Sequence, residues 1–182
     1  MSGVTTVNNV GSTGNLTLTN VGTVPTTLGL NTNSNTTTLE FTSAALAGTS
    51  DTLTVNLDGV SGAAAVSLGR VSGATGTIET VTLVSGSVAN TLNSISGAAL
   101  GTTVAMSGSQ DLTLTTALAG TVTTISAGSA TGALTFTTGA NDTAVTTGSG
   151  NDAVTTGAGD DTITLGAGND TITSGAGDDN IS

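Results

Sequence analysis

The sequence predicts an all-β protein in which a parallel β-solenoid (a β-helix) passes into a β-roll. Three observations lead to this prediction. Short alternations of apolar and Thr residues recur along the chain, Gly, Ser and Asn clusters separate them, and the final part is a strict nonapeptide repeat. Thr supplies 42 of the 182 residues and Gly 27, whereas the aromatic residues are two Phe. Because sandwich cores usually rely on aromatic side chains, a thin and repetitive core suits this chain better.

Residues 1–137 carry the expected strands of an irregular, Thr- and Gly-rich solenoid. Short strands that recur about every 8 to 14 residues are typical of a sandwich, barrel or solenoid, and continuity with the terminal repeats favours the solenoid. Thr, Gly and β-branched residues oppose helix formation throughout. The strands are expected at 16–19, 39–41, 53–57, 66–68, 78–84, 103–106, 112–116, 121–125 and 134–136.

Four nonapeptides follow in strict register from Thr147 to Ser182: TGSGNDAVT, TGAGDDTIT, LGAGNDTIT and SGAGDDNIS. Each has Gly at its second and fourth positions, Asp at its sixth and an apolar residue at its eighth. A degenerate unit, TGANDTAVT at 138–146, lacks the second Gly and carries Asp142 one position early. We therefore expect the β-roll to span 138–182 and to continue directly from the solenoid.

Each nonapeptide has the composition of one turn followed by one short strand. Gly-x-Gly with Asn or Asp is turn chemistry, and an apolar residue between Thr neighbours forms a minimal strand with one inward side chain. Two units then close one coil, so that units 18 residues apart stack at about 4.8 Å. Asp152 is expected above Asp170 on one edge, and Asp161 above Asp179 on the other. Stacked carboxylates repel one another, and a hard divalent cation resolves that repulsion.

Charge and composition exclude several classes of function. The chain has 12 acidic residues, one basic residue (Arg70) and a net charge of −11, so it lacks the basic clusters that bind nucleic acid. Without His, Cys, Lys or Tyr it has no Ser–His triad, thiol nucleophile or Schiff base. A carboxylate pair for glycoside hydrolysis would need a cleft lined with aromatic residues. We expect no enzyme activity and no membrane insertion.

The nonapeptides resemble the RTX family of calcium-binding repeats, whose consensus is GGxGxDxUx with U a large aliphatic residue. The first Gly is replaced here by Thr147, Thr156, Leu165 and Ser174. The resemblance implies that Asp side chains and turn carbonyls of stacked repeats share Ca²⁺ ions. It implies metal-binding positions at Asp152, Asp161, Asp170, Asp179 and Asp142, and in the turns around them at Gly148, Gly150, Asn151, Gly157, Gly159, Asp160, Gly166, Gly168, Asn169, Gly175, Gly177 and Asp178.

The two edges of the β-roll differ in charge. The fifth position of the motif is Asn151 and Asn169 on one edge but Asp160 and Asp178 on the other. We therefore expect the Asp–Asp edge to depend more strongly on bound cation than the Asn–Asp edge.

A weaker resemblance connects the segments 50–57 (SDTLTVNL) and 76–86 (GTIETVTLVSG) to the solenoids of RTX-type bacterial surface-layer (S-layer) proteins. It implies a structural protein that is exported by type I secretion and self-associates into a calcium-dependent lattice on the cell surface, with anchoring to surface polysaccharide through further regions. Because the array runs to Ser182, we expect this chain to be a piece of a longer protein.

Other interpretations stay open at this point. The chain could instead be a calcium-responsive folding and spacer module of a type I-secreted RTX adhesin or enzyme. It could also be an ice-binding solenoid, as outward Thr rows suggest, although ice-binding RTX solenoids carry Thr between the two glycines. The phased aspartates could be plain turn residues. Four further acids could be extra calcium ligands or solvated carboxylates: Asp51, Asp58, Glu79 and Asp111.

Overall fold

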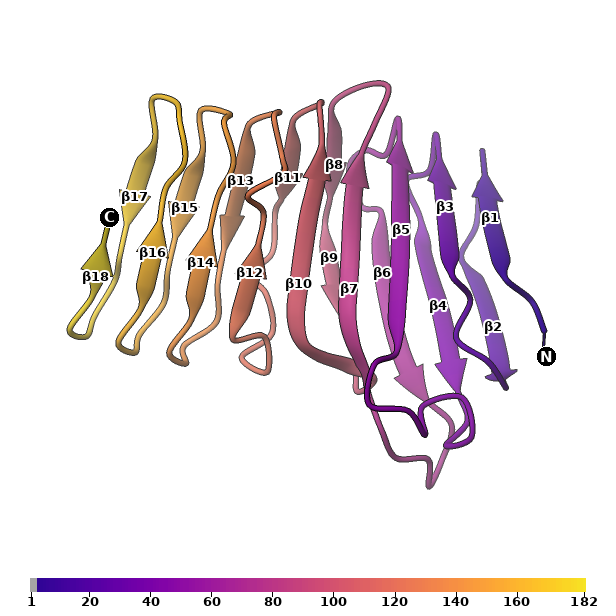
Figure 1. The fold of residues 1–182 in the computed structure, drawn as a ribbon. Coiled ribbons are helices and arrows are strands. Elements are labelled where there is room, and N and C mark those ends of the chain that lie inside the picture. Colours follow the sequence, from indigo (N-terminus) through magenta and orange to yellow (C-terminus); the bar gives the residue numbers. More distant parts are fainter. Residues whose placement is uncertain (1–2) are drawn as a thin grey trace.

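Stacked coils of parallel strands build the whole molecule (Figure 1). The computed structural model describes residues 3–182, and all eighteen elements within them are strands that pair in parallel to form three sheets. The nine-stranded sheet contains β1 (Thr6–Val10), β3 (Thr27–Asn31), β5 (Thr52–Asp58), β7 (Ile78–Ser85), β10 (Leu100–Gly108), β12 (Thr124–Ser126), β14 (Ala144–Thr146), β16 (Thr162–Thr164) and β18 (Asn180–Ile181).

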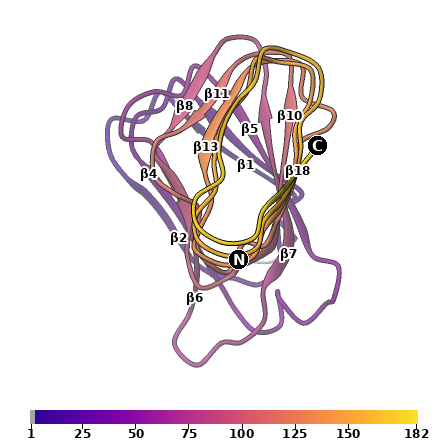
Figure 2. The same ribbon diagram turned by 90° about the vertical axis from the view of Figure 1, so that its left-hand side faces the viewer.

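Two shorter sheets form the opposite wall of the solenoid, which is seen along its axis in Figure 2. The four-stranded sheet contains β2 (Leu16–Val21), β4 (Thr36–Phe41), β6 (Ala65–Arg70) and β9 (Ser94–Ser96). The five-stranded sheet contains β8 (Asn90–Leu92), β11 (Leu112–Leu114), β13 (Leu134–Thr137), β15 (Ala153–Thr155) and β17 (Thr171–Thr173).

The coils become shorter from β5 toward the C-terminus. Thr54 on β5 pairs with Thr82 on β7, 28 positions later. Ala144 on β14 pairs with Thr162 on β16, 18 positions later, and Thr162 pairs with Asn180. Figure 2 shows the result as wide N-terminal coils in indigo and narrow C-terminal coils in yellow. The 18-residue stacking expected from the nonapeptides is therefore present.

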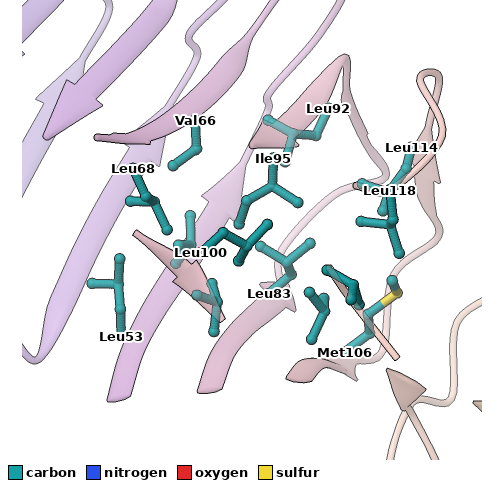
Figure 3. Packing of buried hydrophobic residues seen from close by; sticks show 14 of the residues in the cluster. Leu53, Val66, Leu68, Leu83, Leu92, Ile95, Leu100, Met106, Leu114 and Leu118 are labelled. Atoms are coloured by element: carbon teal, nitrogen blue, oxygen red, sulfur yellow. The ribbon is translucent and has the colours of Figure 1, made fainter. Parts of the chain in front are cut away.

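The core is a narrow apolar column between the two walls. Residues alternate between inside and outside along most strands, as in β5, where Leu53, Val55 and Leu57 are at most 1% exposed. Leu83 and Met106 extend the same column through β7 and β10, as Figure 3 shows. Aliphatic side chains fill this space, which is why so few aromatic residues suffice.

The polar side chain of Asn90 lies inside this column. It is 2% exposed, and its Oδ1 accepts a hydrogen bond from the Val60 N–H at 2.8 Å. Its Nδ2 lies 2.9 Å from Ser85 Oγ and 2.7 Å from the Val88 carbonyl oxygen, and donates to these groups. Asn90 thus connects the start of β8 to the turns around it.

The architecture agrees with the predicted all-β parallel solenoid. Every strand expected between residues 16 and 137 has a counterpart, although the one expected at 121–125 lies at Thr124–Ser126. Four strands were not expected from the sequence: β1, β3, β8 and β9. No helix long and apolar enough to cross a membrane occurs within residues 3–182.

Candidate calcium-binding turns

The turns of the nonapeptides stack in two columns. The first edge contains the turns 148–152 and 166–170, and the second edge contains the turns 157–161 and 175–179. On the first edge, Asp170 Oδ1 accepts a hydrogen bond from the Asp152 N–H at 2.9 Å. On the second, Asp179 Oδ1 accepts from the Asp161 N–H at 3.0 Å. The structure therefore brings together the pairs of aspartates that the 18-residue period predicts.

Asp152 and Asp161 are the most deeply placed acids of the array, at 2% and 1% exposure. Asp152 Oδ1 accepts from the Leu134 N–H and Asp161 Oδ1 from the Thr143 N–H, each at 2.8 Å. The second carboxylate oxygen, Oδ2, of both residues is buried and has no hydrogen-bond partner. A buried, unpartnered carboxylate oxygen is costly in free energy, so each of these atoms has the property expected of a cation ligand.

The fifth position of each repeat forms a second ladder that runs in the opposite direction. Asn151 Oδ1 accepts from the Asn169 N–H, and Asp160 Oδ1 from the Asp178 N–H, both at 2.9 Å. Asp142 Oδ1 accepts from the Asp160 N–H at 3.0 Å in the same manner. Asp142 therefore occupies the fifth position of its coil, which explains why it stands one residue early.

The glycines of the motif allow the turns to approach closely. A Cβ on Gly166 would overlap the carbonyl oxygen of Gly148, and a Cβ on Gly175 would overlap that of Gly157. The same relation holds between Gly168 and the carbonyl oxygen of Gly150. Each repeat thus stacks its backbone carbonyls beside the carboxylates, with no side chain at the glycine positions to separate the coils.

This donor set suits a hard cation that accepts mixed ligands. Ca²⁺ binds six to eight oxygen atoms, including carboxylates and backbone carbonyls. Within residues 3–182, no group of three or more Asp, Glu, His or Cys side chains converges on one point. An ion in these turns therefore needs backbone carbonyl oxygens in addition to its carboxylates, and the glycine-lined stack provides them.

The acids outside the repeats are dispersed. Glu79 Oε2 accepts from the Asp51 N–H at 2.6 Å, and burial together with the negative charge of Glu79 raises the pKa of Asp51. Asp58 Oδ2 accepts from Asn31 Nδ2 at 2.7 Å. Asp111 Oδ1 accepts from the Ala133 N–H at 2.9 Å, so it repeats the fifth-position ladder outside the nonapeptides. Their role as extra calcium ligands stays a prediction.

Sequence reasoning did not identify two features of these turns. One is the unpartnered Oδ2 of Asp152 and Asp161. The sequence does not indicate it, because the burial of a single oxygen atom depends on which coil covers it. The other is the alignment of Asp111 with the fifth-position ladder. The only sequence signal for this alignment is weak: a turn begins at Gly108, and Asp111 follows three residues later.

Comparison with known proteins supports the assignment of the array. Residues 146–181 match the model of the RTX calcium-binding nonapeptide repeat in four copies. No curated protein and no solved structure matches the chain. Repeats of this family bind Ca²⁺ as structural elements and are typical of secreted bacterial proteins. The chain therefore carries four RTX calcium-binding nonapeptide repeats, which form the C-terminal coils of a parallel β-solenoid.

Proposed function

We propose that this protein is a structural component of a bacterial surface layer, secreted in an unfolded state and folded and assembled by extracellular calcium. The observation that carries the calcium dependence is the pair of buried, unpartnered carboxylate oxygens of Asp152 and Asp161. With calcium removed, these charges remain inside the molecule without compensation.

The metal ligands in this proposal are the sixth-position aspartates, Asp152, Asp161, Asp170 and Asp179, together with carbonyl oxygens of the Gly-rich turns. Among the fifth-position side chains, those of Asp142, Asn151 and Asp160 already accept backbone hydrogen bonds through Oδ1. The aspartates at this position contribute mainly to the negative charge around the ions.

Folding of the array and calcium binding are coupled in this proposal. The ligands of each ion come from turns that meet only when the coils stack, so no site exists in the unfolded chain. Extracellular calcium modules bind with Kd values of about 10⁻⁴ to 10⁻³ M, far above the free calcium concentration inside cells. The repeats therefore stay unfolded during export and fold outside.

Assembly is supported by the N-terminal end of the solenoid. Residues 1–39 contain no charged side chain. Uncharged surfaces of this kind can approach one another without electrostatic repulsion, whereas the acidic C-terminal coils repel unless calcium neutralises them.

The test is a calcium titration from a chelated start, followed by far-UV circular dichroism and light scattering. We expect β signal and particle size to rise together at millimolar calcium and to fall again with chelator. A rise in β signal with a monomeric particle would favour the spacer module of a larger secreted RTX protein, a role that the unbroken column of coils also fits. If neither signal responds, calcium-dependent folding is refuted.

Ice binding is a second candidate that one observation favours. Thr164 on β16 is exposed and continues the exposed Thr146 of β14 in one row, whereas the exposed Thr162 stands beside Ala144. Against it, the position between the two glycines is Ser or Ala in all four repeats. Thermal hysteresis measured in saturating calcium separates this function from the first, because a surface-layer component produces none.

A further inference from the structure

A groove crosses the outer face of the N-terminal coils, where β1, β3 and β5 are neighbours in the nine-stranded sheet (Figure 1). Its volume is about 290 Å³, close to the lower limit of about 300 Å³ for pockets that bind small molecules. Neither the folding nor the assembly proposed above uses this groove. Two rows of outward positions line it, with Asn8, Gly29 and Asn56 in one row and Val10, Asn31 and Asp58 in the other.

Gly29 produces the hollow in the first row. Its neighbours on the two adjacent strands, Asn8 and Asn56, both carry an amide side chain at this position. A Cβ on Gly29 would overlap the Oδ1 atom of Asn8, so the side chain of Asn8 extends over the middle strand and forms one wall of the groove. The backbone of Gly29 does not have a positive φ. A side chain is therefore excluded here by the groove and not by the conformation of the chain.

The polar groups of the groove are held in place but not fully used. Asn31 Nδ2 donates to Asp58 Oδ2 at 2.7 Å, which fixes the carboxylate in the second row. Within the described part of the chain, Asp58 Oδ1 and the amides of Asn8 and Asn56 make no hydrogen bond with other protein groups. Each amide provides both donors and an acceptor, whereas a carboxylate provides acceptors alone. The groove thus offers unpaired donors and acceptors on strands about 4.8 Å apart.

Charge and topology argue against the other classes of ligand. The one basic residue of the chain, Arg70, lies on β6 in the opposite wall, so an anion would meet Asp58 without a compensating cation. Asp58 is also the one acid among the residues that line the groove, whereas Ca²⁺ binds six to eight oxygen atoms and would leave most of the volume empty. An extended peptide adds to an unpaired strand edge, but β3 is paired on both sides.

We propose that this groove binds one ring of a neutral sugar through adjacent hydroxyl groups. A hydroxyl group both donates and accepts hydrogen bonds, so it pairs with an Asn amide as well as with the free oxygen of Asp58. Val10, which is 65% exposed beside these groups, gives the C–H groups of the ring an apolar surface. This surface is smaller than that of an aromatic side chain, so binding is weak. With one carboxylate, the groove binds a sugar without the acid pair that hydrolysis requires.

Saturation-transfer NMR on the full chain at saturating calcium tests this inference, because the method detects weak binding. The probes are glucose, galactose and mannose, the methyl glycoside of each and the 6-phosphate of each. We expect transfer to at least one neutral sugar and none to its 6-phosphate. A methyl glycoside that also binds identifies the ligand as a sugar unit within a glycan, whereas binding of the unmodified sugar alone identifies a free sugar. Either result supports the site.

Two substitutions connect the signal to the groove. Gly29→Val fills the hollow and should abolish binding, and because a β-branched residue suits a strand, circular dichroism should stay unchanged. Asp58→Asn keeps an oxygen for Asn31 Nδ2 but removes the charge, and should weaken binding about tenfold. Ser107→Val is the matched control, because Ser107 lies in the same row as Gly29 but two strands beyond Asn56, outside the groove. Asn56→Ala replaces Gly29→Val if that variant fails to fold.

Three results would overturn the sugar site. They are the absence of transfer to every neutral sugar, equal binding by Gly29→Val and the unaltered chain, and stronger transfer to a 6-phosphate than to its neutral sugar. None of them affects the calcium titration, because the groove lies outside the nonapeptides. A chain that folds and assembles with calcium but binds no sugar would therefore refute this inference and leave the proposed function in place.

Discussion

Gly166 lies so close to Gly148 in the coil before it that a Cβ on Gly166 would overlap the carbonyl oxygen of Gly148. The spacing between the coils therefore depends on the absence of a side chain at this position. Because the obstacle is backbone rather than a flexible side chain, neither partner can move aside without opening the stack.

We expect Gly166→Ala to destabilise the array by about 1–3 kcal/mol, the usual cost of overpacking. The loss should appear as a higher calcium midpoint in circular dichroism. Ala167→Ser is the matched control, because Ala167 is exposed in the same turn. Equal midpoints for Gly166→Ala and the unaltered chain would show that the coils are not held this closely in solution.

Because the two edges differ in charge, replacing Asp by Asn on one edge and Asn by Asp on the other should shift the calcium concentration needed for folding in opposite directions. Asp160→Asn with Asp178→Asn removes two exposed charges but keeps an oxygen to accept the backbone hydrogen bond, as Asn151 does for Asn169. We expect this double variant to fold at a lower calcium concentration. Asn151→Asp with Asn169→Asp should require more calcium. If the Asn-substituted chain keeps the original midpoint, the two edges do not differ in their dependence on cation.

Asn90 gives a prediction for the solenoid outside the repeats. Replacement by Ala leaves the Val60 N–H without its acceptor inside the core, which should cost about 1–3 kcal/mol of unfolding free energy. Urea denaturation measures the loss. Asn56→Ala, at an exposed position of β5, should change stability by less than about 0.5 kcal/mol. Similar losses for the two variants would contradict the role of Asn90 in the core.

Asp51 predicts a pH dependence of stability. Its pKa is raised above the ordinary value of 3.8 by burial and then by Glu79, so the native state binds this proton more tightly than the unfolded chain. Stability due to this group therefore falls as pH rises from 3.8 through the raised pKa. We expect Asp51→Asn to have a higher Tm than the unaltered chain at neutral pH, and the difference to vanish below pH 3.8.

The control for this prediction is Glu79→Gln, which removes the neighbouring charge but keeps an oxygen to accept from the Asp51 N–H. It should reduce the Tm gain of Asp51→Asn without abolishing it, because burial is the larger cause of the shift. A Tm gain for Asp51→Asn that persists unchanged below pH 3.8 would show that titration of Asp51 is not its source.

The periodic part of the fold could be predicted from the sequence, whereas the irregular part could be predicted only in part. The spacing of the nonapeptides determines which residues stack, because two repeat periods equal one coil. Strand β1 was missed because Asn8 and Asn9 interrupt its apolar pattern, and β3 because Gly29 lies at its centre. Parallel pairing with neighbouring strands overrides these weak local preferences.

The candidate site shows the same division. Stacking of Asp152 with Asp170 and of Asp161 with Asp179 follows from the 18-residue period. The direction in which each carboxylate extends does not follow from it, because the hydrogen bond to the preceding coil is a property of the folded turn. The alignment of Asp142 with Asp160 could not be predicted either, because it also depends on a hydrogen bond of the folded turn.

The constant 18-residue coil of the C-terminal part has a consequence for how such a rod changes in length. Each added pair of nonapeptides would extend the rod by one strand spacing, about 4.8 Å, and would leave its cross-section and both edges unchanged. The wider N-terminal coils lack this property, since neighbouring coils there differ in length. Duplication or loss of repeat pairs can therefore change the length of the molecule in equal steps without any change in how the core packs.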